Sequence, residues 1–309
     1  MKKLVVALLL MVSATVSMAS DQIKFVLPFP PGGQSDQVMK ILQNKLSQDL
    51  NRTIVAEYKP GAGGEIASAY VANSTGPGLV LLFNNISMIM HPPTKKKSYN
   101  DQDLMHLATI ATFDSVLVVP AAGKIKSWDE FVNGSNSTPA SFGAFGLGGL
   151  WLSGQLLQQQ TGKNITVVPY KGGVPILVDI IGNRLDMAPF ASGFIREHVQ
   201  AGKVIPIAAI SKQRLPDFPQ VPTLLEKGYS IDGSFNWTAV FANRTARPND
   251  LETVSLSLRK ILSDREVVKQ LKDLGFNVDQ SLDINNKNFL EAQRKRFSKI
   301  INKIDSSEM

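Results

Sequence analysis

Apolar and polar residues along the chain follow a repeated pattern of strand, glycine-rich turn and helix. Residues 23–27 alternate in polarity, as one face of a strand does, and prolines then end the strand. Gly32 and Gly33 form a turn that leaves room for a ligand beside the backbone. A helix follows, for which Ser35 or Asp36 is the expected N-cap residue. Its apolar face consists of Val38, Ile41, Leu42 and Leu46.

The same arrangement occurs twice more. A strand over 53–57 leads through the turn 58–64 to a helix over 65–72, and a strand over 140–144 leads through the turn 145–149 to a helix over 150–160. Backbone amides at such helix starts point into solvent and attract anions. The three turns therefore predict one shared anion-binding place, and plain strand-to-helix connections that bind nothing are the alternative.

Further strands and helices alternate to the end of the chain. Apolar segments predict strands over 79–83, 116–119, 166–168, 185–189, 205–210 and 237–241, a short helix over 223–228 and a C-terminal helix over 287–304. Such alternation is typical of parallel α/β sheets, here in two units around a shared cleft. Asn84, Asn85 and Ser87 directly follow a buried strand, where α/β sheets bind ligands, and turn capping is their alternative role.

The first 19 residues have the features of a signal peptide. Lys2 and Lys3 make the start basic, residues 4–12 are apolar but too few to cross a membrane, and small residues favour cleavage after Ala19. The chain contains no cysteine, which excludes a lipidated N-terminal cysteine, disulfides and thiolate chemistry. Together these features predict export to a bacterial periplasm without a lipid anchor.

Length and charge limit the classes of partner. The 309 residues are enough for two domains, and the formal charge of +7 becomes +5 when Lys2 and Lys3 are removed with the signal peptide. This moderate surplus suits small anionic ligands and does not favour nucleic acid. The lysine run 95–97 and the basic face of the C-terminal helix, which includes Arg294, are expected to be solvated.

The sequence contains no pattern of catalytic residues. His91, His106 and His198 lie in separate segments without metal-ligand spacing, and neither a G-x-S-x-G nor a G-x-x-x-x-G-K-[ST] motif occurs. The glycine turns at 61–66 and 146–151 lack the third glycine of a dinucleotide-binding fingerprint. We therefore expect no cofactor, no metal and no enzymatic activity, but a protein that closes on a ligand. An enzyme on the same architecture is the alternative.

Five motifs occur in a fixed order along nearly the whole mature chain. They are residues 28–33 (PFPPGG) with Asp36, 60–64 (PGAGG), 168–172 (VPYKG) with Pro175 and Asp179, 201–203 (AGK), and 221–223 (VPT) with Glu226 and Gly228. In these motifs the chain resembles the substrate-binding receptors of tripartite tricarboxylate transporters, often called the Bug family.

The resemblance implies a type II periplasmic-binding-protein fold, with two α/β domains around a ligand cleft. Residues 20–119 and 241–309 would form the first domain and residues 120–240 the second. The resemblance also implies a monomeric receptor that captures a small carboxylate for membrane transporter subunits. Presentation of the ligand to a membrane sensor kinase is the alternative role.

In this family a ligand carboxylate is held mostly by backbone amides of the first glycine loop. Carried over by resemblance, the ligand contacts of this chain are Phe29, Pro30, Gly32, Gly33, Asp36, Asn84, Asn85, Gly146, Gly148, Gly149, Tyr170 and Gly172. The chain departs from the family at Gly149 and Leu152, where a hydroxyl residue and a histidine are usual, and at residues 190–192, where an acid is usual. We therefore expect a ligand with one well-recognised carboxylate and a less polar remainder.

Overall fold

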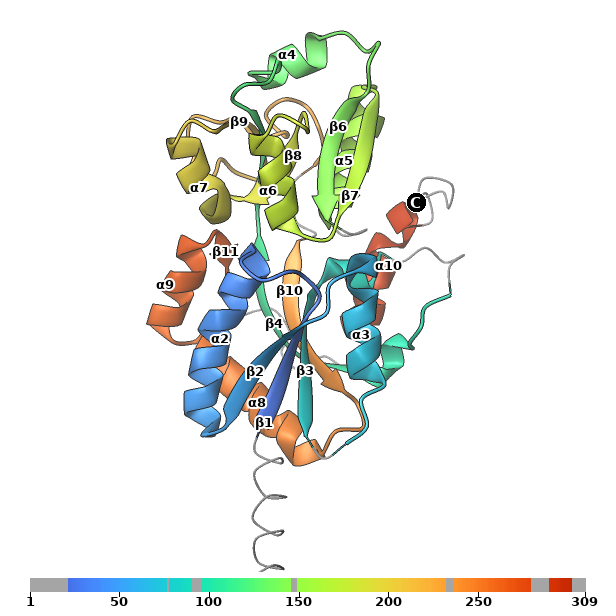
Figure 1. Cartoon of the computed structure of the whole chain (residues 1–309), viewed down its shortest axis with the longest axis vertical. Coiled ribbons are helices and arrows are strands. Elements are labelled where there is room, and N and C mark those ends of the chain that lie inside the picture. Colours follow the sequence, from blue (N-terminus) through green and yellow to red (C-terminus); the bar gives the residue numbers. More distant parts are fainter. Residues whose placement is uncertain are drawn as a thin grey trace, which may run out of the picture.

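The structure, a computed structural model, describes residues 22–76, 78–90, 96–145, 149–231, 236–278 and 289–301. It contains two α/β lobes, one above the other in Figure 1. The expected signal peptide, residues 1–19, lies outside the described residues, as do Gly146 and Gly148 of the third glycine turn.

A six-stranded sheet forms the centre of the first lobe, in the order β11-β4-β10-β3-β1-β2. Its strands are β1 (Gln22–Leu27), β2 (Thr53–Tyr58), β3 (Leu79–Asn85), β4 (Leu104–Phe113), β10 (Trp237–Asn243) and β11 (Phe276–Asn277). β1 runs parallel to β2 and β3, whereas β10 is antiparallel to β3 and β4. The expectation of purely parallel sheets is therefore wrong, because the whole second lobe, and not a crossover helix, connects β4 with β10.

Helices from both ends of the chain cover this sheet. α2 (Gln34–Leu50) packs against α8 (Pro248–Leu262) and α9 (Arg265–Asp273), while α3 (Glu65–Ala72) packs on β3 and β10. Val38, Leu42 and Leu46 are fully buried on the inner side of α2, as their spacing predicts. The amphipathic pattern therefore orients α2 so that its first turn lies at the carboxyl end of β1.

The second lobe contains two small sheets. β5 (Ser115–Pro120) is antiparallel to β8 (Ala188–Ala191) and β9 (Val204–Ile210), and β6 (Ala140–Phe145) is parallel to β7 (Ile165–Tyr170). Its helices are α4 (Trp128–Asn133), α5 (Gly149–Thr161), α6 (Gly173–Ile181) and α7 (Ser192–Gln200). Residues 224–228 form turns and Thr223 a β-bridge to Ala209, not the expected helix, since Pro222 and Gly228 bound a segment of little more than one turn.

Two segments connect the lobes. β4 continues through Asp114 into β5, and the chain returns between β9 and β10. β4 has no counterpart among the expected strands, because eight of its ten residues are buried and no alternation of polarity marks it. The domain boundary expected after residue 119 lies inside β5, and both hydrogen-bonding partners of β5 are strands of the second lobe.

Candidate functional site

The loop between β1 and α2 presents backbone amides where the two lobes meet. Gly33 is the N-cap of α2 and no side chain caps the helix, so the expectation that Ser35 or Asp36 is the cap is wrong. Among the described residues, the amides of Gly33, Gln34 and Ser35 donate no hydrogen bond, although all three residues are buried. Unpaired buried amides are costly, and at a helix start they favour a negative charge. This end of α2 can therefore bind a carboxylate.

Asp36 supports this loop from within the first lobe. Its carboxylate accepts hydrogen bonds from the Gly32 amide at 2.8 Å and the Tyr58 hydroxyl at 2.5 Å, and it pairs with Lys40 at 3.0 Å. Burial works to raise the pKa of Asp36, but these donors outweigh it and the pKa is lowered. Burial and the neighbouring Asp36 raise the pKa of Tyr58 to about 12. Asp36 thus holds the turn at Gly32, whose φ of 84° favours glycine.

Asn84 and Asn85 end β3 beside the second glycine turn. The fully buried Asn84 donates from its side chain to the Ser68 hydroxyl at 3.0 Å and accepts from the Asn85 amide at 2.8 Å. The Asn85 side chain accepts from the Ser87 amide at 2.9 Å and caps the short 3-10 helix η2 (Ile86–Met88). The Asn85 side chain therefore performs the turn capping that the sequence left as an alternative, while Asn84 joins the end of β3 to Ser68. Contact of either residue with a ligand stays a prediction.

The second lobe lies directly against the β1–α2 loop. The rings of Phe29 and Phe145 meet edge to face, with centroids 5.2 Å apart. A β-carbon on Gly172 would lie 2.8 Å from Cδ of Pro30, so a larger residue would push the lobes apart here. The ends of β6 and β7 are therefore brought to the amino end of α2, as the glycine turns predict.

Gly149 and Tyr170 complete the described candidates in the second lobe. Gly149 is the buried first residue of α5, and its carbonyl accepts from the Ser153 hydroxyl at 3.0 Å. The Tyr170 hydroxyl donates to Asp179 at 2.6 Å, and Asp179 also accepts from Arg184. Burial and Asp179 raise the pKa of Tyr170 to about 12. The hydroxyl is thus engaged within its own lobe, which leaves the ring and backbone of Tyr170 for a ligand.

Three residues that support the site are missing from the sequence-based set. Gln34 accepts from the Ala191 amide at 3.4 Å and so joins the lobes directly, while Tyr58 and Ser68 hold Asp36 and Asn84. Tyr58 carries a recognisable signal, since it is a polar aromatic residue where a strand enters a glycine turn. Gln34 meets Ala191 of the other lobe and Ser68 meets Asn84 at the end of the next strand, and no local pattern marks either role.

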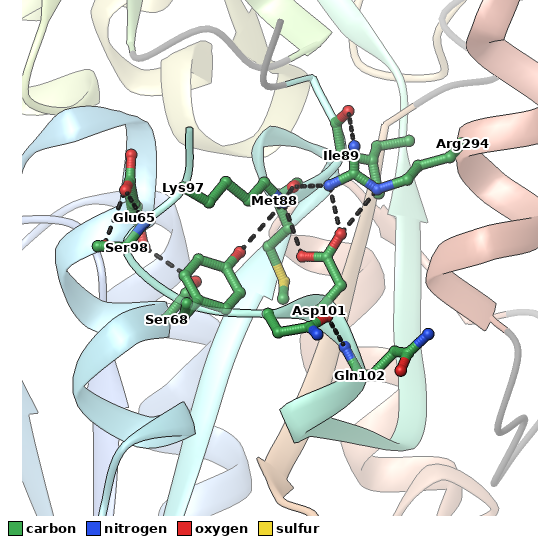
Figure 2. Close-up of polar contacts among 12 residues, drawn as sticks. Glu65, Ser68, Met88, Ile89, Lys97, Ser98, Asp101, Gln102 and Arg294 are labelled. Carbon is green, nitrogen blue, oxygen red and sulfur yellow. Dashed lines mark hydrogen bonds and ion pairs between the residues drawn. The ribbon is translucent and has the colours of Figure 1, made fainter. Parts of the chain in front are cut away.

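A cluster of polar side chains holds Met88, the last residue of η2, by its backbone carbonyl. Figure 2 shows Lys97 and Arg294 reaching the carbonyl of Met88 from two sides, at 2.7 Å and 3.1 Å, with Asp101 below them. Lys97 also pairs with Asp101 at 2.7 Å, and burial lowers the pKa of Lys97. The expectation that the lysine run is solvated is wrong for Lys97, whose side chain is only 14% exposed.

Arg294 brings α10 (Phe289–Ile301) into the same cluster. Its guanidinium donates to Asp101 at 2.7 Å and to the carbonyl of Ile89 at 3.3 Å. Phe289, at the start of the helix, stacks on His106 with centroids 4.2 Å apart. The expectation of a solvated basic face is therefore wrong for Arg294, because the helix docks through this residue onto the segment that follows β3.

The described part of the site offers backbone amides without a partner at the start of α2. Within the described ranges, no group of three His, Asp or Glu side chains is placed to hold a metal ion. In the same ranges, no helix combines the length and apolar character needed to cross a membrane.

Comparison with known proteins places this arrangement in a family. Residues 38–306 match the profile described as tripartite tricarboxylate transporter family receptor, TctC. BugT of Bordetella pertussis is 28% identical over 257 residues, which cover 80% of this chain and 78% of BugT.

Solved structures share the fold. MatC from Rhodopseudomonas palustris with bound malate has a TM-score of 0.78 and 21% identity, covering 91% of this chain and 98% of MatC. A second R. palustris protein, with adipate, has a TM-score of 0.80 and 23% identity, covering 90% and 95%. The expected type II periplasmic-binding-protein fold of two α/β domains is thereby confirmed. With the family match over most of its length, the chain belongs to the tripartite tricarboxylate transporter receptor family, a family of periplasmic solute-binding receptors.

Proposed function

We propose that this chain is a periplasmic receptor that captures a small carboxylate and delivers it to the membrane subunits of a tripartite transporter. The amino end of α2 carries the proposal, because the amides of the buried residues Gly33, Gln34 and Ser35 have no hydrogen-bond partner among the described residues. Two structural neighbours hold malate and adipate, which are both carboxylates. The family match supports delivery to membrane subunits, and the signal-like first 19 residues support export.

In the proposed site, the ligand carboxylate lies against the first turn of α2. Asp36 positions this turn and does not touch the ligand, because its oxygens already accept from the Gly32 amide and Tyr58 and pair with Lys40. Phe29, Pro30 and Gly172 form the wall where the lobes meet, and their apolar surface suits a ligand remainder of low polarity. Gly146, Gly148, Gly149 and the ring of Tyr170 would contribute from the second lobe.

We further propose that the lobes move about their two connections when the ligand binds. The second lobe would comprise residues 115–236, since in the described part of the chain β5 pairs with β8 and β9, while β10 belongs to the first sheet. Asp114 and the segment between β9 and β10 would then act as the hinge.

Variants at Gly33 test the carboxylate site. Gly33 has a φ of −79°, and a β-carbon there would lie no closer than 3.8 Å to the atoms around it, so a side chain can start at this position without a clash. The mature protein is refolded from denaturant to remove bound ligand, and mono-, di- and tricarboxylates are then titrated by calorimetry. For the carboxylate that binds, Gly33→Asp should weaken binding by about tenfold or more, because two like charges would share one helix terminus.

The neutral variants separate charge from shape. Gly33→Asn has the size of aspartate without its charge, so it should weaken binding less, and Gly33→Ala should remain within about threefold of the wild type. Binding of no carboxylate, or an equal effect of all three substitutions, would overturn the proposed site. Much tighter binding of a tricarboxylate than of a monocarboxylate of similar size would overturn only the proposal that the rest of the ligand has low polarity.

A further inference from the structure

A groove of about 960 Å³ lies between the lobes, and none of its lining residues belongs to the β1–α2 loop. The first lobe lines it with the end of β4, α9, the residues around β11 and one residue of α10. The second lobe lines it with the start of α7 and residues 212–217 after β9. α7 and α9 face each other across this junction on the left of Figure 1.

The lobes touch at this groove. Arg196 of α7 donates to the carbonyl of Asp273 at 3.2 Å, across the two lobes. A β-carbon on Gly193 would lie 2.3 Å from the carbonyl carbon of Leu274. The width of the groove therefore depends on how the second lobe sits on the first.

Basic side chains dominate the lining. The six basic residues are Arg196, Lys212, Arg214, Lys269, Lys272 and Arg296, against three acids, Asp114, Asp217 and Asp273. The excess is three positive charges, while the chain without Lys2 and Lys3 carries +5 in total. Each lobe contributes three of the basic residues, so the two walls carry charge of the same sign. Such walls repel each other and attract an anion between them.

Two of these lysines are available to a ligand. Lys212 in the second lobe and Lys272 in the first are exposed, and within the described part of the chain neither ammonium group donates a hydrogen bond or lies within ion-pair distance of an acid. Arg196 and Lys269, by contrast, already pair with Asp217 and Asp273 at 2.8 Å. An anion in the groove would therefore meet one free ammonium group from each lobe.

We propose that this groove is a second anion-binding site, for a small anion with two or more negative charges that bridges Lys212 and Lys272. The residues that line this groove differ from those of the carboxylate site proposed at α2. Because its walls belong to different lobes, an occupied groove stabilises the relative position of the lobes that is seen here.

Inorganic pyrophosphate is a suitable probe, since it is multiply charged and carries no carboxylate. We expect calorimetry at constant ionic strength to show saturable binding of one pyrophosphate per chain. The double variant Lys212→Glu/Lys272→Glu should lose at least about tenfold in affinity, because both bridging charges are reversed. The matched control Lys203→Glu/Arg259→Glu makes the same change in net charge at two exposed positions outside the groove, one in each lobe. It should remain within about twofold, since screened distant charges act weakly.

The Gly33→Asp background distinguishes the two anion sites. Pyrophosphate binding that persists there and is lost in the groove variant supports the proposal. If Gly33→Asp abolishes binding and the groove variant keeps it, pyrophosphate binds at α2 and the proposed groove site is overturned. The proposal is also overturned if pyrophosphate does not bind, or if the groove variant and the control variant lose equal affinity. If circular dichroism shows that the charge-reversal variant does not fold, Lys212→Gln/Lys272→Gln gives the same comparison with a smaller expected loss.

Discussion

Pro30 of the first lobe and Gly172 of the second lie in direct contact: a β-carbon on Gly172 would come within 2.8 Å of Cδ of Pro30. The backbone of Gly172 is extended, with a φ of 171°, so the absence of a side chain here serves the approach of the lobes and not an unusual conformation. One of the close approaches between the two lobes therefore requires that Gly172 has no side chain.

Gly172→Ala should hold the lobes apart and weaken carboxylate binding by about tenfold, while the unfolding midpoint changes little. The proline ring cannot rotate away as a flexible side chain would. Calorimetric titration with the identified ligand, together with thermal unfolding of the ligand-free protein, measures both effects. Gly173→Ala is the control, because a β-carbon there would lie 4.0 Å from its nearest neighbour. Equal carboxylate affinities of Gly172→Ala and Gly173→Ala would contradict the prediction that a β-carbon at position 172 holds the lobes apart.

The Asp36–Tyr58 hydrogen bond should stabilise both the fold and the binding loop. Tyr58→Phe removes a donor to a buried carboxylate, and we expect a loss of about 1–2 kcal/mol in the free energy of unfolding. A double-mutant cycle with Asp36→Asn, measured by urea unfolding, should show that the two effects are coupled. Tyr70→Phe is the matched control, since its hydroxyl donates to the half-buried Glu57 at 3.2 Å, away from the loop. Strictly additive effects would disprove the coupling.

Arg294 should anchor the C-terminal helix. Arg294→Ala removes the hydrogen bonds to Met88, Ile89 and Asp101, and we expect a loss of about 1–3 kcal/mol in the free energy of unfolding. Arg294→Lys keeps the charge without the forked geometry and should recover only part of it. Lys295→Ala, at the exposed neighbouring position, should change stability by less than about 0.5 kcal/mol. A loss as large for Lys295→Ala would argue against a specific role for the cluster.

His106 should make stability depend on pH. Its ring is buried, Nε2 lies 3.0 Å from the Thr109 hydroxyl, and Nδ1 has no partner among the described residues. Burial lowers the pKa of His106 from 6.5 to about 4, so below pH 6.5 the unfolded chain binds a proton that the folded chain does not. Stability is therefore full above pH 6.5 and falls as the pH drops toward 4, by about 3 kcal/mol in total.

The double variant His106→Phe/Thr109→Val removes the titrating group and its hydrogen-bond partner together. Urea unfolding at several pH values between 7 and 4 should then give a smaller decline for the variant than for the wild type. Parallel curves for the two proteins would show that His106 is not the source of the dependence. The carboxylates common to both proteins cancel in this comparison.

Local spacing in the sequence was enough to identify the elements that build the first glycine loop. The strand over 23–27, the helical face of Val38, Leu42 and Leu46, and the helix over 65–72 all appear where their patterns predict them. Each depends on residues within a turn or two of one another, and such preferences act before any tertiary contact forms. The loop position of Gly32 is predictable for the same reason, because few other residues adopt its φ.

Tertiary structure alone decided which distant segments come together around the site. Lys97 and Arg294 belong to charged stretches that are typical of solvated surfaces, yet both bond the Met88 carbonyl. β4 is buried on both faces, so the strand that leads from one lobe to the other shows no alternation of polar and apolar residues by which the sequence could predict it. Contacts between residues far apart in the sequence depend on how the folded segments pack against one another. Such packing produces no periodic pattern in the sequence. The sequence therefore determined the separate strands, helices and glycine turns, and the packing of the lobes decided how they combine into a site.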